Sequence, residues 1–241
     1  MQSPSYIAVS RQAALMRQMD VVANNIANAG TPGFKGEHML FAEYLQEEPG
    51  GSGISYVHDL STVRDGRPGE LRATGNDLDL AIQGDGYLVA ETPAGDRYTR
   101  NGQLQLDADR RVVTSHGYPI LTEGGQTLVV PEDAADLSIT PDGIVTAGEQ
   151  ELGRLNLVRF ENEGALKKTL GGLYTTDEEP LPALDARVLQ GMTESSNIQP
   201  VLEMTRMMEV HRAFQSVQNM LNGEHERMTR AIRELPRTEP S

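Results

Sequence analysis

The chain has 241 residues, a formal net charge of −14, 38% hydrophobic residues and no cysteine. The negative charge, without any basic stripe carrying interleaved aromatic residues, argues against binding to nucleic acid. The lack of cysteine excludes disulfides, thiolate metal ligands and cysteine nucleophiles. No apolar window approaches the roughly 18 residues of a membrane span, and the N-terminus lacks the pattern of a secretory signal. We therefore expect neither membrane insertion nor a cleaved signal peptide.

The N-terminal segment, residues 1–35, is predicted to form an amphipathic helix. Its apolar residues recur at spacings of three and four, whereas the charged residues fall largely off that line. The stripe consists of Leu15, Met19, Val22, Ile26 and Ala29. The helix should end within residues 29–33 (AGTPG), because glycine can adopt a left-handed cap conformation and proline cannot continue a helix.

The middle of the chain changes to the periodicity of β-strands. Residues 36–73 are predicted to form an extended linker or hairpin, in which the glycine-rich segment 47–53 is a flexible loop. Residues 74–190 are predicted to form a β-rich domain, because short alternating runs are separated by turn sequences. These runs are 78–82, 87–90, 103–106, 111–114, 126–130, 144–146 and 152–160. No helix-length pattern alternates with them, so we expect antiparallel hairpins and not parallel βαβ units.

The C-terminal segment, residues 191–241, is predicted to contain a second and longer helix. Its apolar residues follow alternating steps of three and four, which is typical of a heptad repeat. They are Met207, Val210, Phe214, Val217, Leu221, Met228, Ala231 and Leu235. Pro200 suits the first helical turn and Pro236 ends the run, so a helix over 201–235 would be roughly 50 Å long.

Together these elements predict a mixed α and β fold. Long N- and C-terminal helices pair as a coiled coil, and an antiparallel β-rich domain is inserted between them. The C-terminal stripe can contribute about 12 to 20 kcal/mol of burial, but only where something covers it. Ordering the backbone costs about 1 to 2 kcal/mol per residue before hydrogen bonds offset it, so the helix requires a partner. The N-terminal stripe is the nearest partner but is shorter, and the uncovered remainder favours contacts with other molecules.

No residue pattern supports an enzyme. The five histidines are scattered without metal-ligand spacing, and neither a nucleophile elbow nor a phosphate-binding loop is present. Residues 76–86 (NDLDLAIQGDG) offer acidic oxygens for Ca²⁺, but their spacing does not match an EF-hand loop, and the alternation also describes a half-buried strand. We favour the strand and expect no catalytic residue, no metal and no cofactor. The alternative left open is an acidic β-domain that binds a small ligand or Ca²⁺ and is dimerised by its helices.

Three motifs carry a resemblance to a known family. They are ANNIANAGTPGFK at residues 23–35, TGNDLDLAIQGDGY at 74–87 with YTRNG at 98–102, and GMTESSNIQP at 191–200. In this order they resemble the signatures of bacterial flagellar rod and hook proteins, and the resemblance covers essentially the whole chain. The length and residues 6–12 (YIAVSRQ) are most similar to one type of basal-body rod protein, with the distal rod protein as the alternative.

The resemblance implies a structural subunit of the flagellar basal-body rod, which assembles helically through its terminal helices and transmits torque from motor to hook. The implied partners are other rod subunits, copies of the chain itself and the flagellar type III export apparatus. The implied location is the periplasmic rod, reached without a cleaved signal peptide. The predicted assembly residues combine the two apolar stripes with asparagines of the first motif. They are Leu15, Met19, Val22, Asn24, Asn25, Ile26, Asn28, Met207, Val210, Phe214, Val217 and Leu221.

Overall fold

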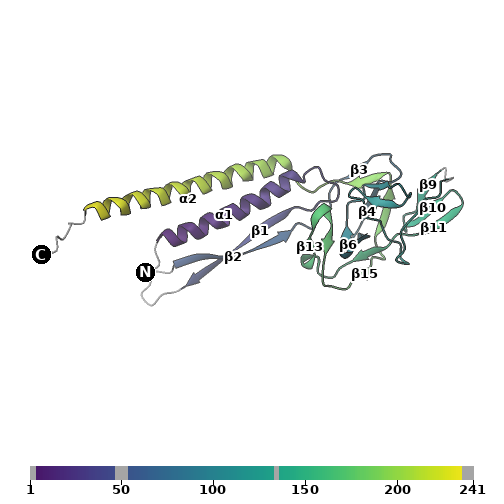
Figure 1. Ribbon diagram of the computed structural model, residues 1–241, viewed down its shortest axis with the longest axis horizontal. Coiled ribbons are helices and arrows are strands. Elements are labelled where there is room, and N and C mark those ends of the chain that lie inside the picture. The colour runs from purple at the N-terminus through teal and green to yellow at the C-terminus, as the bar shows by residue number, and fades with distance from the viewer. Residues whose placement is uncertain (1–3, 47–53, 133–135, 235–241) are drawn as a thin grey trace. The chain divides into compact units, whose positions relative to one another are not determined.

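The computed structural model describes residues 4–46, 54–132 and 136–234 (Figure 1). The chain divides into two compact units. Unit 1 consists of Met1–Ala27, Glu37–Val63 and Gln199–Ser241, and unit 2 of Asn28–Gly36 and Arg64–Ile198. Within the described ranges, no helix is long and apolar enough to cross a membrane.

Unit 1 contains the two long helices, α1 (Pro4–Ala27) and α2 (Pro200–Glu234). Figure 1 shows them side by side, and the Asn25 side chain near the end of α1 hydrogen-bonds Glu203 near the start of α2. The helices therefore run antiparallel. The apolar side chains buried along the pair are Ala8, Ala14, Val22, Val210 and Val217. α2 begins at a proline, whose missing N–H is not needed in the first helical turn.

The segment between α1 and unit 2's β-rich part forms a pair of strands. β1 (Glu37–Gln46) and β2 (Ile54–Arg64) make a two-stranded sheet. The loop predicted at residues 47–53 lies outside the described residues.

Unit 2 holds short strands and two 3₁₀ turns. Its first strands are β3 (Leu71–Ala73), β4 (Leu80–Gln83), β5 (Tyr87–Thr92), β6 (Gly95–Thr99), β7 (Leu104–Leu106), β8 (Val112–Thr114), β9 (Leu137–Ile139) and β10 (Ile144–Ala147). They are followed by β11 (Gln150–Arg154), β12 (Leu157–Arg159), η1 (Glu163–Ala165), β13 (Lys167–Lys168), η2 (Leu170–Gly172), β14 (Tyr174–Thr175), β15 (Leu181–Pro182), β16 (Arg187–Gln190) and β17 (Met192–Glu194).

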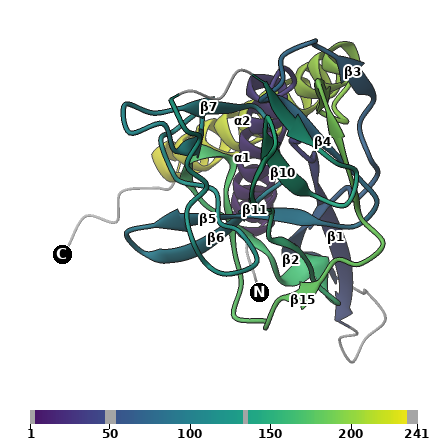
Figure 2. The ribbon, with the colours of Figure 1, turned by 90° about the vertical axis from the view of Figure 1, so that its right-hand side faces the viewer.

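The strands of unit 2 form several small antiparallel sheets. The largest has the order β13-β14-β6-β5-β12-β15, and a three-stranded sheet has the order β11-β10-β9. Two pairings join strands far apart in the chain, because β16 pairs with β4 and β17 pairs with β3. Figure 2 shows β5 and β6 as a hairpin within this assembly. The C-terminal part of unit 2 therefore completes sheets begun by its N-terminal part.

Two apolar clusters form the core of unit 2. The first includes Leu80, Leu88 and Ile120, which have no exposed surface. The second is aromatic and gathers Tyr87, Tyr98, Phe160 and Tyr174, with Tyr98 and Phe160 ring centroids 4.7 Å apart. β5 shows the alternation of a pleated strand, because Leu88 and Ala90 belong to the first cluster and Tyr87 and Val89 to the second.

The predicted mixed α and β class and the antiparallel β-rich region are confirmed, with differences in the strands. The predicted strand 126–130 is wrong, because Thr127 bridges Leu121 whereas Val129 bridges Arg111, so no continuous ladder forms. The predicted strand 152–160 is divided into β11 and β12. Near it, the pairing of β10 with β11 shifts register between Val145 and Thr146, which marks a bulge.

Candidate functional site

The apolar stripes predicted for assembly lie on the paired helices of unit 1. Val22, Val210 and Val217 are each 5 to 6% exposed. The other members of the stripes are partly buried: Leu15, Met19, Ile26, Met207, Phe214 and Leu221. α1 and α2 pack against each other, so the structure brings the two stripes into one helix pair within one subunit.

The three asparagines predicted for assembly lie in different environments. Asn25 is 1% exposed, and its amide group pairs with both main-chain groups of Glu37, accepting from N–H at 3.0 Å and donating to C=O at 2.8 Å. The Nδ2 group of Asn25 also donates to Glu203 Oε2 at 3.2 Å. Asn28 is half-buried and accepts a hydrogen bond from the Thr31 hydroxyl, whereas Asn24 is exposed. Asn25 thus fixes α1 against α2 and the start of β1, a role that sequence reasoning missed.

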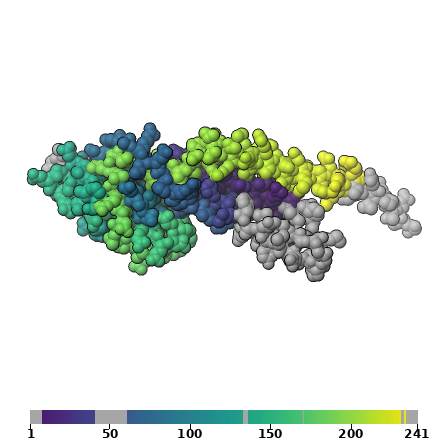
Figure 3. All heavy atoms as spheres, turned by 180° about the vertical axis from the view of Figure 1, so that it is seen from behind, coloured from purple at the N-terminus to yellow at the C-terminus, as the bar shows by residue number. Residues whose placement is uncertain are grey.

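A second set of exposed apolar side chains lies outside the helix seam. On α1 and α2 these are Val9, Met16, Val201, Leu202, Met204, Met208 and Met220, whereas Met228 is exposed on the predicted stripe itself. Figure 3 shows α2, in green to yellow, lying at the surface of unit 1. Exposed apolar side chains grouped on one helix mark interaction surfaces more often than single ones do.

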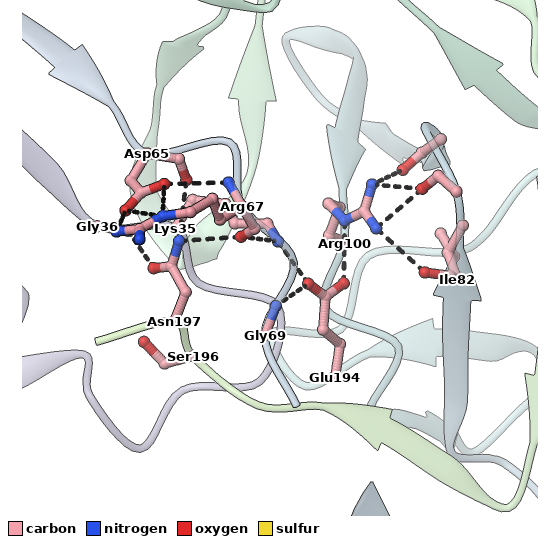
Figure 4. Close-up of polar contacts among 12 residues, drawn as sticks. Lys35, Gly36, Asp65, Arg67, Gly69, Ile82, Arg100, Glu194, Ser196 and Asn197 are labelled. Atoms are coloured by element: carbon pink, nitrogen blue, oxygen red, sulfur yellow. Dashed lines mark hydrogen bonds and ion pairs between the residues drawn. The ribbon is translucent and has the colours of Figure 1, made fainter. Parts of the chain in front are cut away.

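A buried polar cluster in unit 2 joins the three sequence motifs (Figure 4). We call it the clamp, and it consists of Lys35, Gly69, Arg100, Glu194 and Asn197. Glu194 Oε1 accepts hydrogen bonds from the Lys35 ammonium and, at 2.8 Å, from the Gly69 N–H. Glu194 Oε2 accepts from Arg100 Nε at 3.0 Å. The ionic side chains of Lys35, Arg100 and Glu194 are 5%, 6% and 2% exposed, so the clamp is an interior ion cluster.

Arg100 connects the clamp to the Gly-Asp-Gly turn of the second motif. Its guanidinium donates to the carbonyl oxygens of Ile82, Gly84 and Gly86, all at 3.1 Å. With the bond to Glu194, the side chain uses donors on all three of its nitrogens. The planar fork of arginine suits this arrangement better than the single ammonium of lysine.

Asn197 ties together chain segments that are far apart in sequence. Its Oδ1 accepts from the Gly36 N–H at 2.8 Å, and its Nδ2 donates to the carbonyl oxygens of Asp65 at 2.9 Å and Arg67 at 3.0 Å. The backbone adds a bond from Gly33 N–H to Glu194 C=O at 2.7 Å. The first motif, residues 64–69 and the third motif are therefore held side by side within unit 2.

The charges of the clamp shift one another's ionisation. Burial acts to raise the pKa of Glu194, but the charge of Arg100 and the hydrogen bonds from Lys35 and Gly69 outweigh it and lower that pKa. Burial lowers the pKa of Lys35, and Glu194 opposes this effect. Lys35 and Arg100 are both paired with Glu194, which is typical of a structural ion cluster and not of an acid–base site.

The acidic segment considered for Ca²⁺ also serves local structure. Asp79 is buried and accepts from Asn76 Nδ2 at 3.1 Å, whereas Asp77 is exposed. Among the described residues, no three His, Cys, Asp or Glu side chains are grouped so that they could hold a metal ion. The geometry gives the Ca²⁺ alternative no support.

Comparison with known proteins identifies the family. Residues 6–35 match the family described as flagella basal body rod protein, residues 81–147 the D1 domain of flagellar hook protein FlgE/F/G, and residues 189–234 the C-terminal region of flagellar basal body rod FlgEFG proteins. The flagellar basal-body rod protein FlgF of Caulobacter vibrioides is 37% identical over 241 residues, covering 98% of each chain. The chain belongs to the family of flagellar basal-body rod proteins.

Within this rod protein family, the FlgF type fits better than FlgG. FlgF of Mesorhizobium japonicum is 32% identical and covers 98% of each chain. FlgG of Bacillus subtilis is 30% identical, over 88% of this chain and 90% of its own. The family indicated by the three motifs is thus confirmed. The FlgF-like type is also confirmed over the alternative, the distal rod protein FlgG. The rod protein is a structural subunit of the flagellar basal body and not an enzyme.

Proposed function

We propose that this rod subunit assembles into a helical array through its terminal helices and transmits torque from motor to hook. The observation that carries the proposal is the uncovered apolar surface of α2. Met228 continues the stripe that contains Val217, yet Met228 is 51% exposed and Val217 is 6% exposed. α1 has 24 residues and α2 has 35, so α1 cannot cover the whole stripe. The remaining surface requires another molecule to gain its burial energy.

We assign different roles to the two sets of apolar residues. The buried seam supports coiled-coil pairing of α1 with α2 inside one subunit, because the predicted assembly residues of both stripes are buried or half-buried. The exposed set, which includes Met16, Met204 and Met208, is available to neighbouring rod subunits and other copies. Of the predicted asparagines, the exposed Asn24 suits contact with neighbouring subunits. Asn25 supports such contacts indirectly, because it fixes the position of α1.

The roles that we propose for the segments of the chain follow from the family resemblance. Residues 1–35 and 191–241 form the inner core of the rod, residues 74–190 form an outer layer, and residues 36–73 link them. The subunit leaves the cytoplasm through the flagellar type III export apparatus, without a cleaved signal peptide, and works in the periplasmic rod. Family membership supports this route.

The double substitution Met204→Asp with Met208→Asp tests the assembly proposal. Both side chains are more than half exposed, at 52% and 53%, so two carboxylates there leave the fold of the isolated subunit intact. They would place charge in the proposed interface between subunits, which is strongly unfavourable. We expect swimming in soft agar to fall to the level of a strain lacking the gene, and electron microscopy to show incomplete rods.

The control adds charge on a different face of α2. Ser216→Asp alters an exposed polar position that points about 100° away from Met204 and Met208 around the helix axis, and we expect normal rods and swimming. Urea unfolding of each purified variant checks that the subunit itself is unchanged. Normal swimming by the Met204 and Met208 variant would show that this face of α2 is not an interface.

A further inference from the structure

A small polar cavity lies beside the clamp, inside unit 2. Its volume is about 80 Å³, and Lys35, Asp85, Tyr87, Arg100 and Glu163 contribute to its walls. Liquid water takes about 30 Å³ per molecule, so the cavity has room for two or three water molecules. It is too small for an organic ligand, since such ligands bind in cavities of roughly 300 Å³ or more.

Several hydrogen-bonding groups at this cavity are incompletely used by the protein. Lys35 has three ammonium donors, and they have two acceptors among the described residues, Arg67 C=O and Glu194. The Tyr87 side chain is 2% exposed, and its hydroxyl makes no hydrogen bond to any described residue. Burial raises the pKa of Tyr87, so the hydroxyl keeps its proton and remains a donor.

Glu163 supplies an acceptor on the cavity wall. Arg64 holds its main chain in place, because Arg64 Nη1 donates to the Glu163 C=O at 3.3 Å and Nη2 to the Leu166 C=O at 2.6 Å. The Glu163 carboxylate lies beside Gly66, whose added Cβ would stand 3.7 Å from Oε2. The part of the chain that the structure describes offers this carboxylate no hydrogen-bond donor.

The charges around the cavity point to a neutral occupant. Lys35 and Arg100 share a single carboxylate in the clamp, that of Glu194. The negative charge of Glu163 acts on both Lys35 and Tyr87 across the cavity. With Asp85, the wall carries two cations and two anions, so neither an anion nor a cation gains from entering.

We propose that the cavity holds ordered water that bridges the Lys35 ammonium and the Tyr87 hydroxyl to the Glu163 carboxylate. Glu163 thereby acts as the second counter-ion of the Lys35–Arg100 pair, through water and not by direct contact. The water gives these donors the acceptors that the described residues do not supply, and the polar groups of the cavity wall are its partners. This inference does not depend on how the subunits assemble.

The lysine content of the chain makes a direct test practical. Lys35, Lys167 and Lys168 are the three lysines of the sequence, so lysine labelled with ¹³C and ¹⁵N gives few signals. In the full-length protein we expect nuclear Overhauser effects between the Lys35 ammonium protons and long-lived water. Tyr87→Phe removes one partner of that water but keeps the ring, so it should weaken these effects.

The counter-ion role is tested by titrating the Lys35 side chain. Glu163→Gln should move the pH midpoint of the Lys35 ¹³Cε signal downward and leave that of the exposed Lys167 in place. Glu161→Gln, two residues away with an exposed side chain, is the matched control and should leave Lys35 unchanged. Either of two results would overturn the proposal: no long-lived water at Lys35, or the same Lys35 midpoint in both glutamine variants.

Discussion

Replacing Glu194 by glutamine tests how strongly the clamp stabilises unit 2. The substitution keeps the size of the side chain but removes the negative charge between Lys35 and Arg100. Both cations remain buried beside an uncharged amide. Breaking a buried ion pair by removing one partner costs about 3 to 5 kcal/mol, whereas whole domains are stable by only about 5 to 15 kcal/mol. We therefore expect Glu194→Gln to remove a large part of the free energy of unfolding of unit 2.

The aromatic cluster of unit 2 provides the signal for this measurement. The chain has no tryptophan, and Tyr87, Tyr98 and Tyr174 pack together in unit 2. Their near-ultraviolet circular dichroism therefore follows the loss of tertiary packing during urea unfolding. Glu70→Gln is the control, because it removes an exposed carboxylate from the adjoining segment and should change stability by less than about 0.5 kcal/mol.

A second test is the pH dependence of the difference in unfolding free energy between the wild-type protein and Glu194→Gln. The pKa of Glu194 is lowered in the folded state from an ordinary value of 4.5, so the unfolded chain binds more protons as the pH falls below that value. The stabilisation from Glu194 is therefore fully present above pH 4.5 and is lost as the pH falls through the folded-state pKa. The difference in the free energy of unfolding between the wild-type protein and Glu194→Gln should therefore become smaller in that acidic range. A loss below about 1 kcal/mol at pH 7, or a gap that does not change with pH, would refute the reasoning.

Two further substitutions test other parts of the structure. Gly33 has φ +68°, and an added Cβ would lie 2.4 Å from the Arg100 carbonyl oxygen, so Gly33→Ala should destabilise unit 2 by about 1 to 3 kcal/mol. Gly30→Ala is its control, since no atom lies within 4 Å of the added Cβ, and equal thermal shifts in the two variants would contradict the expectation. Asn25→Ala should destabilise the protein by about 1 to 3 kcal/mol in urea unfolding, because it leaves the partly buried N–H and C=O groups of Glu37 without their partner. Asn24→Ala changes an exposed neighbour, and a loss of the same size there would argue against a special role for Asn25.

Sequence patterns predicted the elements whose signals are local. The period of the apolar stripes predicted both helices, and Pro200 marked the start of α2. The period of two predicted the β-rich character of unit 2, although β13, β14 and β15 have two residues each and were not predicted. Strands this short have no periodicity of their own and form only because a partner strand is already in place.

From the sequence, the side chains of the clamp could be recognised only as members of three separate motifs. Lys35, Arg100, Glu194 and Asn197 all lie inside them, which identified the family but gave no reason for these particular residues. Each of these charged residues lies mainly among polar or small residues and has the appearance of an ordinary surface residue. The contact between Lys35 and Glu194 spans 159 positions, and nothing in either local sequence specifies that partner.

By itself, the sequence determined the helical stripes, the antiparallel β-rich region and membership of the rod protein family. Only the tertiary structure decided which stripe residues are covered inside one subunit, and which charges are buried together. The physical reason is the range of the interactions. Helix and strand periodicity arises from neighbours a few residues apart, whereas the pairing of a buried charge depends on which distant segment the folded chain brings beside it.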